Sequence, residues 1–198
     1  MNSILLIGSG GHARSLIDLI ETSSHWDIYG LVGLASQVGS SVFGYPVLGC
    51  DSMLPQLRSE CSAALLAIGH LADSSRREHL AANLSTLGFH SPTSVSRHAI
   101  VSKHARFGLG TVLCHGAIVN AGSFIGDHCI INSRALIEHD VHISDHCHIS
   151  TGALVNGGVR IGAGSFVGSG SILREGLDLP AKSVISAGKR VMGWPLTK

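Results

Sequence analysis

The 198-residue sequence predicts a small α/β domain over residues 1–90, followed by an all-β parallel β-helix over residues 91–198. Two observations predict this fold. Strand and helix patterns alternate in the first part, and in the second an aliphatic or Phe side chain returns at every sixth residue. A six-residue period fits neither an α-helix nor a hairpin sheet, and it is typical of a β-helix in which each hexad forms one short strand and one corner. The repeating positions are Val101, Phe107, Leu113, Val119, Ile125, Ile131, Ile137, Ile143, Ile149, Val155, Ile161, Val167, Leu173, Leu179, Ile185 and Val191.

Three hexads complete one triangular coil, so residues that are eighteen apart in sequence stack on one another. The fourth residue after each large side chain is mostly small, which lets the backbone turn at a corner. The residue directly after the large one is often Gly, Asn or Ser, and we expect a positive φ there. Cys129 and Cys147 are eighteen apart and are expected to be small buried fillers of one edge.

The first part begins with an apolar strand at residues 3–8, then the turn Gly8-x-Gly10-x-x-Ala13, then a helical pattern. This arrangement presents backbone N–H groups to a phosphate, although tight packing of the turn is an alternative explanation. The second strand, at about 28–33, ends in Val32-Gly33 without the acid that holds the ribose of NAD, which argues against NAD.

Further along the first part, residues 51–58 and 73–87 read as helices and residues 63–69 as a strand, with Asp73 or Ser74 capping the second helix. A nucleotide site is expected at the carboxyl ends of the strands, around Gly10–His12 and Gly69-His70.

Composition excludes several classes of function. A net charge of +1 gives no reason to expect nucleic acid, and 44% hydrophobic with 14% charged residues favours a folded chain over a disordered one. No apolar run reaches the length of a membrane span, and the N-terminus lacks a signal-peptide pattern, so we expect a cytoplasmic protein. The five cysteines follow no disulfide framework.

Most of the 13 histidines fall on the coils, and exposed corner positions account for the majority. His128 and His146 are expected to stack at a solvated edge. His139 differs, because Asp140 follows it at a corner and Gly157 lies eighteen residues later. A carboxylate beside a histidine fixes its tautomer, as a general base requires, and a neighbouring glycine exposes an N–H that could hold an oxyanion.

Five motifs together carry a resemblance over nearly the whole chain: GSGGHA, AIGH, INSRALIEHD, HIS-x-GA at 148–153 and the closing GWP. They resemble the sialic-acid O-acetyltransferase and nucleotide-sugar N-acetyltransferase family. The resemblance implies a Rossmann-like N-terminal domain and a left-handed β-helix. It also implies a homotrimer with active sites between adjacent β-helices, and acetyl-CoA as the acyl donor.

The resemblance also implies a role for individual residues. Those that it marks are His139 as general base, Asp140 as the acid beside it, His148 at the acetyl carbonyl, Gly157 as a backbone contact to the cofactor, Asn132 near the sugar, and Gly10, Gly11, His12 and Gly69 as the nucleotide-sugar cradle. Many relatives carry an acidic pair where this chain has Val32-Gly33.

The expected reaction is direct N-acetylation of a nucleotide-linked 4-amino-deoxysugar, with no metal. O-acetylation of a sialic acid uses the same base and is the main alternative. A non-catalytic trimeric sugar-binding scaffold is another, and it would release no CoA. A zinc anhydrase on the same β-helix would need two histidines five residues apart, and this sequence has none.

Overall fold

The computed structural model describes residues 3–23 and 25–195, so the parts of the predicted domains at residues 1–2, 24 and 196–198 lie outside the described residues. The chain divides into two compact units. The first comprises residues 1–69 and 76–92, and the second comprises residues 70–75 and 93–198. The short segment 70–75 therefore belongs with the coils, although it precedes them in the chain.

The first unit is a parallel sheet with helices, in the strand order β3-β4-β2-β1-β5. β3 pairs antiparallel to β4, and the other pairs are parallel. Its elements are β1 (Ser3–Ile7), α1 (Gly11–Ser23), β2 (Asp27–Val32), η1 (Ala35–Gln37), β3 (Ser41–Val42), β4 (Tyr45–Gly49), η2 (Asp51–Met53), α2 (Leu54–Glu60), β5 (Ala63–Leu66) and α3 (Ser75–Thr86). The turn residues Gly44 and Pro46 predict a loop where β3 and β4 lie, and this prediction is wrong for these two strands.

The core of this unit follows from the apolar patterns. β1 is the strand between β2 and β5, and Ile4 to Ile7 are each at most 1% exposed, as expected of a strand that is covered on both faces. α1 buries one stripe that includes Leu16, Ile17 and Ile20. Among the described residues, none of the helices has the length and apolar character needed to cross a membrane.

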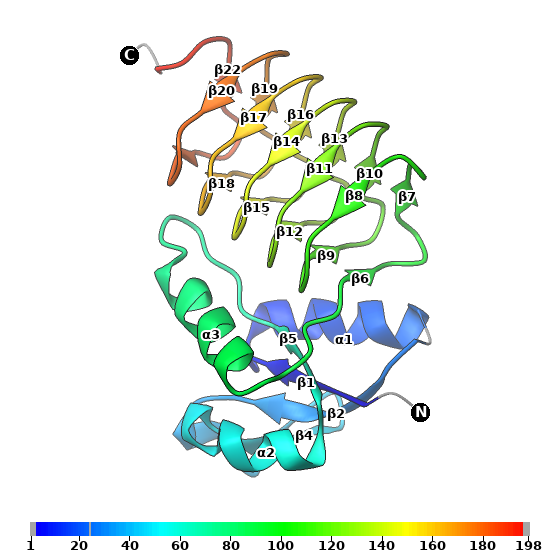
Figure 1. Cartoon of the computed structure of the whole chain (residues 1–198), viewed down its shortest axis with the longest axis vertical. Helices are drawn as coiled ribbons and strands as arrows, with labels where there is room; N and C mark the ends of the chain where they lie inside the picture. The colour runs from blue at the N-terminus through cyan, green and yellow to red at the C-terminus, as the bar shows by residue number, and fades with distance from the viewer. Residues whose placement is uncertain (1–2, 24, 196–198) are drawn as a thin grey trace. The chain divides into compact units, whose positions relative to one another are not determined.

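The second unit is a stack of triangular coils (Figure 1). Its strands are β6 (Ser94–Val95), β7 (Ile100–Val101), β8 (Arg106–Phe107), β9 (Val112–Leu113), β10 (Ile118–Val119), β11 (Phe124–Ile125), β12 (Ile130–Ile131), β13 (Leu136–Ile137), β14 (His142–Ile143), β15 (His148–Ile149), β16 (Leu154–Val155), β17 (Arg160–Ile161), β18 (Phe166–Val167), β19 (Ile172–Leu173), β20 (Asp178–Leu179), β21 (Val184–Ile185) and β22 (Arg190–Val191). The period extends one strand earlier than predicted, to Val95.

These strands form three sheets, one on each side of the triangle. We call them by a member strand: the β13 sheet (β22-β19-β16-β13-β10-β7), the β14 sheet (β20-β17-β14-β11-β8) and the β15 sheet (β21-β18-β15-β12-β9-β6). Every pairing joins residues eighteen apart, such as Ile131 with Ile149. The predicted stacking is therefore confirmed.

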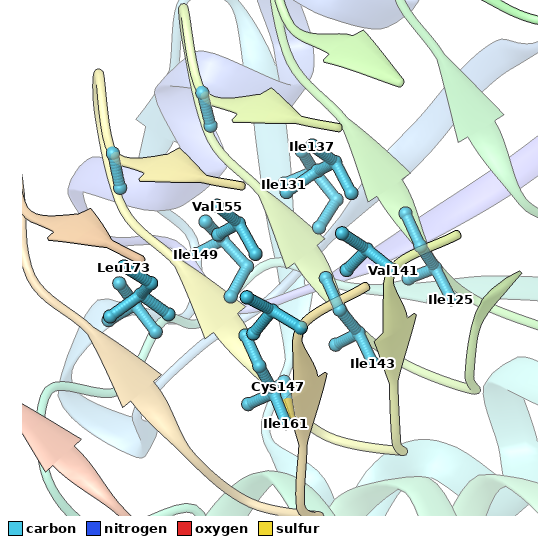
Figure 2. Packing of buried hydrophobic residues seen from close by; sticks show 14 of the residues in the cluster. Ile125, Ile131, Ile137, Val141, Ile143, Cys147, Ile149, Val155, Ile161 and Leu173 are labelled. Atoms are coloured by element: carbon cyan, nitrogen blue, oxygen red, sulfur yellow. The ribbon is translucent and has the colours of Figure 1, made fainter. Parts of the chain in front are cut away.

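The large aliphatic side chains fill the interior of the coils (Figure 2). Ile131, Ile149 and Val167 are fully buried, and so are small side chains such as Ala135 and Ala153. The small residue is thus a core residue, and its size is set by the narrow space beside a corner.

The expected position of the positive φ is wrong. Left-handed conformations fall on the third residue after the large side chain, for example Arg134 (φ 60°) and Gly152 (φ 65°), and not on the first. The glycines that directly follow the large side chain are required for a different reason. A Cβ on Gly168 would lie 2.5 Å from the backbone nitrogen of Ala187 in the adjacent coil, so the close approach of coils excludes a side chain.

Candidate active site

His139 and Asp140 lie at the corner between β13 and β14. Asp140 takes the left-handed conformation of that corner, with φ 58°. Its N–H donates to the Ala121 carbonyl at 3.0 Å, and Gly158 N–H in the next coil donates to the His139 carbonyl at 3.0 Å. The backbone that carries both side chains is therefore fixed by the coils on either side.

The imidazole of His139 is oriented by its neighbour. Its Nδ1–H donates to Asp140 Oδ2 at 3.0 Å, because an ionised carboxylate can only accept. The lone pair of the neutral ring then lies on Nε2. The two side chains are 67% and 74% exposed, so this nitrogen is accessible to a ligand.

The carboxylate also sets the proton affinity of the ring. The hydrogen bond to Asp140 raises the pKa of His139. Loss of hydration opposes this rise, and the charges of Asp140 and Glu138 add to it. An accessible histidine with a fixed tautomer and a raised pKa has the properties of a general base.

Gly157 stacks beneath the His139 ring, as its position eighteen residues later predicted. A Cβ on Gly157 would lie 2.7 Å from both Cε1 and Nε2 of His139. Any side chain at this position would displace the ring. The Nε2 atom of His139 therefore faces bare backbone in the adjacent coil.

Glu138 and Asn120 support this corner, although the sequence motifs point to no role for them. Asn120 Nδ2 donates to Glu138 Oε2 at 3.0 Å, and the same oxygen accepts the His139 N–H at 3.3 Å. Their spacing of eighteen residues was the available signal, since it places Glu138 directly over Asn120.

Asn132 and His148 form a second group. His148 Nδ1–H donates to the carbonyl of His70 at 2.8 Å, which leaves Nε2 of the neutral ring as an acceptor, and Asn132 Nδ2 donates to it at 3.2 Å. The rings of His70 and Phe166 pack edge-on against His148, with centroids 5.6 and 5.3 Å away. His148 is only 6% exposed.

These two groups lie on different sides of one coil. His139 and Asp140 occupy the edge between the β13 and β14 sheets, whereas His148 belongs to the third sheet. The described chain thus brings Gly157 to His139 and brings Asn132 to His148, but it does not bring the two groups together.

The glycines of the first unit fall into two classes. Gly8 has φ 132°, and a Cβ there would lie 2.6 Å from the Ala67 carbonyl oxygen, so packing alone requires it. Around Gly10 and Gly11 a Cβ would meet nothing within 4 Å, so their backbone faces open space.

Gly10 lines a pocket of about 190 Å³ at the carboxyl ends of β1 and β2. Its other lining residues are Ile7, Gly8, Ser9, Val32, Gly33, Leu34, Gln37, Asp51, Ile68, Arg76 and Leu80. Of the four predicted cradle residues, Gly10 alone lines this pocket in the described part of the chain; Gly11 and Gly69 are exposed and His12 is half-buried.

Comparison with known proteins identifies relatives of both units. The family model of the PglD N-terminal domain matches residues 3–84, and the model of the hexapeptide repeat of succinyl-transferase matches residues 158–190. None of the curated proteins matches the chain.

Solved structures give longer matches. A histidine-to-asparagine mutant of perosamine N-acetyltransferase from Caulobacter crescentus, in complex with CoA and GDP-perosamine, is 30% identical with a TM-score of 0.89, over 98% of this chain and 91% of that chain. The acetyltransferase domain of PglB from Neisseria gonorrhoeae FA1090, in complex with acetyl coenzyme A, is 31% identical with a TM-score of 0.86, over 95% of this chain and 90% of that chain. The chain belongs to the family of hexapeptide-repeat acyltransferases that includes these two proteins.

This family membership confirms the resemblance seen in the sequence and the predicted fold, a small α/β domain followed by a left-handed β-helix. It also confirms that the chain is an acyltransferase. Within residues 3–23 and 25–195, no group of three or more His, Cys, Asp or Glu side chains is placed to hold a metal ion.

Proposed function

We propose that this acyltransferase moves the acetyl group of acetyl-CoA to the amine of a nucleotide-linked 4-amino-deoxysugar, with His139 as general base. The observation that carries the proposal is the accessible His139 Nε2, which Asp140 orients over the bare backbone of Gly157. The relatives support the substrates, since one was solved with CoA and GDP-perosamine and another with acetyl coenzyme A.

In the proposed step, the amine nitrogen attacks the thioester carbon while Nε2 of His139 takes one of its protons. The new C–N bond forms, the C–S bond breaks, and the imidazolium returns its proton to the departing CoA thiolate. Asp140 stabilises the imidazolium. In this proposal the N–H of Gly157 contacts the cofactor and stabilises the oxyanion on the carbon under attack. No acyl-enzyme is needed.

The proposed role of His148 at the acetyl carbonyl has a structural condition. Its Nδ1–H is committed to the His70 carbonyl and its Nε2 accepts from Asn132. His148 can therefore donate to an oxyanion only when its ring takes up a second proton, on Nε2, and the Asn132 amide turns away. We propose that the arriving sugar, which Asn132 is expected to contact, draws that amide away from the ring.

The first unit is proposed to bind the nucleotide part of the acceptor. The open backbone at Gly10 and Gly11, at the start of α1, presents N–H groups to a diphosphate. His12 and Gly69 complete this proposed cradle.

We further propose that three chains assemble through the β13 sheet. The outward side chains of this sheet form an aliphatic column from Ile100, which is 65% exposed, through half-buried positions to Ile172. The column consists of Ile100, Ile118, Leu136, Leu154 and Ile172, and the exposed Arg190 of β22 ends it. The outward column of the β14 sheet is instead mixed and carries charges at both ends, since it runs through Arg106, Phe124, His142, Arg160 and Asp178. Aliphatic faces of this kind are typical of subunit contacts.

Assembly would also join the two separated groups, because His139 of one subunit could then face His148 of another. In light scattering, the chain should have three times its mass of 20.6 kDa. Leu136→Glu should yield monomers, and Arg106→Glu on the β14 sheet should leave the trimer intact. A monomeric unmodified chain would overturn the assembly.

Mixing two inactive variants tests the shared site. If His139→Asn and His148→Asn chains assemble at random, about a quarter of the junctions carry both native histidines, so activity should return to about a quarter of the native value. A mixture as inactive as its components would show that both histidines act from one chain.

The proposed reaction is tested by CoA release, detected with a thiol reagent, using acetyl-CoA and a panel of acceptors. The panel contains UDP-, dTDP- and GDP-linked 4-amino sugars beside free and CMP-linked sialic acids. Release with an amino-sugar nucleotide should fall about 10²- to 10⁴-fold in His139→Asn. His104→Asn, which changes an exposed histidine two coils away on the same edge, should react normally. Release with sialic acids alone would replace the proposal with O-acetylation.

A further inference from the structure

Gly33, directly after β2, leaves room for a hydrogen bond between Ser9 and Gln37. Ser9 Oγ–H donates to Gln37 Oε1 at 2.9 Å, and the backbone N–H of Leu34 donates to the same oxygen at 2.9 Å. A Cβ on Gly33 would lie 2.5 Å from Ser9 Oγ and 3.0 Å from Gln37 Oε1. An acid at position 33 and the Ser9–Gln37 hydrogen bond are therefore mutually exclusive.

These bonds fix the orientation of the Gln37 amide. A backbone N–H can only donate, so the atom that faces Leu34 must be the carbonyl oxygen and not the NH₂ group. The oxygen already accepts two hydrogen bonds, and η1 holds the side chain because Gln37 N–H donates to the Leu34 carbonyl at 2.8 Å. Within the described residues, the two amide hydrogens have no acceptor, and Gln37 lines the pocket.

The pocket lies where the nucleoside of a bound nucleotide is expected. The strand order β4-β2-β1-β5 changes direction at β1, and ligands of such sheets bind at the carboxyl ends beside that switch point. Phosphates sit at the glycine turn after the first strand, and the nucleoside lies toward the end of the second, here Val32 and Gly33. Asp51 lines the same pocket and supplies a carboxylate, while Leu80 and Ile68 supply apolar walls.

We propose that Gln37 is a specificity residue that reads the nucleobase of the acceptor, and that the pocket selects bases with a carbonyl next to a ring N–H. Uracil, thymine and guanine have this edge. The amide of Gln37 donates to the base carbonyl, and the Asp51 carboxylate accepts from the ring N–H. Adenine and cytosine present an amino group and a bare ring nitrogen instead, which leaves both protein groups facing groups of like polarity. The inference rests on the proposed nucleotide-sugar acceptor.

Gln37→Glu is the sharpest test, because it preserves the size of the side chain. One carboxylate oxygen still accepts from Ser9 and Leu34, while the other terminal atom of the side chain changes from donor to acceptor. Gln56→Glu is the matched control, since it adds the same charge to an exposed position on α2 outside the pocket. The measurement is calorimetric binding of free UDP, GDP, CDP and ADP to the full chain, without acetyl-CoA.

The unmodified chain should bind UDP and GDP more tightly than CDP and ADP. Gln37→Glu should weaken UDP and GDP by roughly 10- to 100-fold, and leave CDP and ADP unchanged or tighter. Gln56→Glu should behave as the native chain. An equal change for all four nucleotides would show that Gln37 holds the ribose or phosphates, which overturns the inference and leaves the proposed function intact.

Two further outcomes separate the inference from the function. If none of the four nucleotides binds the native chain, both the nucleotide acceptor and the inference fail. If UDP and GDP bind with the stated preference but no amino-sugar nucleotide elicits CoA release, the proposed reaction fails and the base-reading role of Gln37 stands.

Discussion

Gly157→Ala is the most direct perturbation of the proposed catalytic corner. The added Cβ would lie 2.7 Å from Cε1 and Nε2 of His139, whereas ordinary contacts begin at 3.4 Å, so the ring must retreat by at least about 0.7 Å. The ring is mostly exposed and can move, but moving disturbs its hydrogen bond to Asp140. A misplacement near 1 Å can lower a rate about 10²-fold, so we expect kcat to fall roughly 10- to 100-fold.

The assay is steady-state CoA release with acetyl-CoA and the acceptor each varied, together with thermal unfolding. Because no fully buried group is displaced, Tm should change little. The decisive control is the same substitution in a His139→Ala background. With no ring to displace, Gly157→Ala should add almost nothing to the loss caused by His139→Ala, so the two effects should be strongly non-additive.

Additive losses would refute this reasoning, because they would mean that the new methyl group acts on something other than the His139 ring. A raised KM for acetyl-CoA in both backgrounds would identify that target as the cofactor. An unchanged kcat in Gly157→Ala would show that the ring position does not limit the reaction and would count against His139 as the base.

Three further predictions concern the pH dependence of the reaction, the core of the coils and the tautomer of His148. Asp140 raises the pKa of His139, and a general base works in its unprotonated form. Asp140→Asn should therefore move the acidic limb of the pH profile of kcat/KM to lower pH and lower the plateau. An acidic limb that stays in place would show that this limb does not report the titration of His139. Ile149→Ala removes a fully buried side chain from the coil stack and should lower the free energy of unfolding by about 2–5 kcal/mol in urea denaturation, and a loss below 1 kcal/mol would show that the coil collapses around the gap. NMR of the ring nitrogens of His148 at pH above 8 should show the Nδ1–H tautomer, because the His70 carbonyl accepts from that atom, and an Nε2–H signal would contradict the donor assignment.

The coils were predictable because one rule covers all of them. A side chain at a repeating position has the same neighbours six and eighteen residues away, so the core, the sheets and the stacking of His139 on Gly157 can be read from spacing alone. The location of the positive φ was not readable in this way. Arg134 and Asp140 hold left-handed conformations without being glycine, because the coils above and below fix their backbone.

Contacts that do not follow the six-residue period could not be predicted from the sequence. His148 bonds to the carbonyl of His70, a residue 78 positions earlier on a segment that folds against the coils, and no spacing rule links the two. The hairpin of β3 and β4 was missed because Pro46 and Gly44 read locally as a loop, while pairing with β2 stabilises the strand.

Gly33 shows why the role of a single residue is hard to interpret from one sequence. Glycine there looks like the absence of a binding group. In the folded unit, Gly33 makes a binding group possible, since only a residue without Cβ leaves room for Ser9 and Leu34 to hold the Gln37 amide in place. Gly33 thus stands together with two polar partners that orient the amide of Gln37, a residue that lines the pocket. We expect this arrangement to set which ligand the pocket prefers.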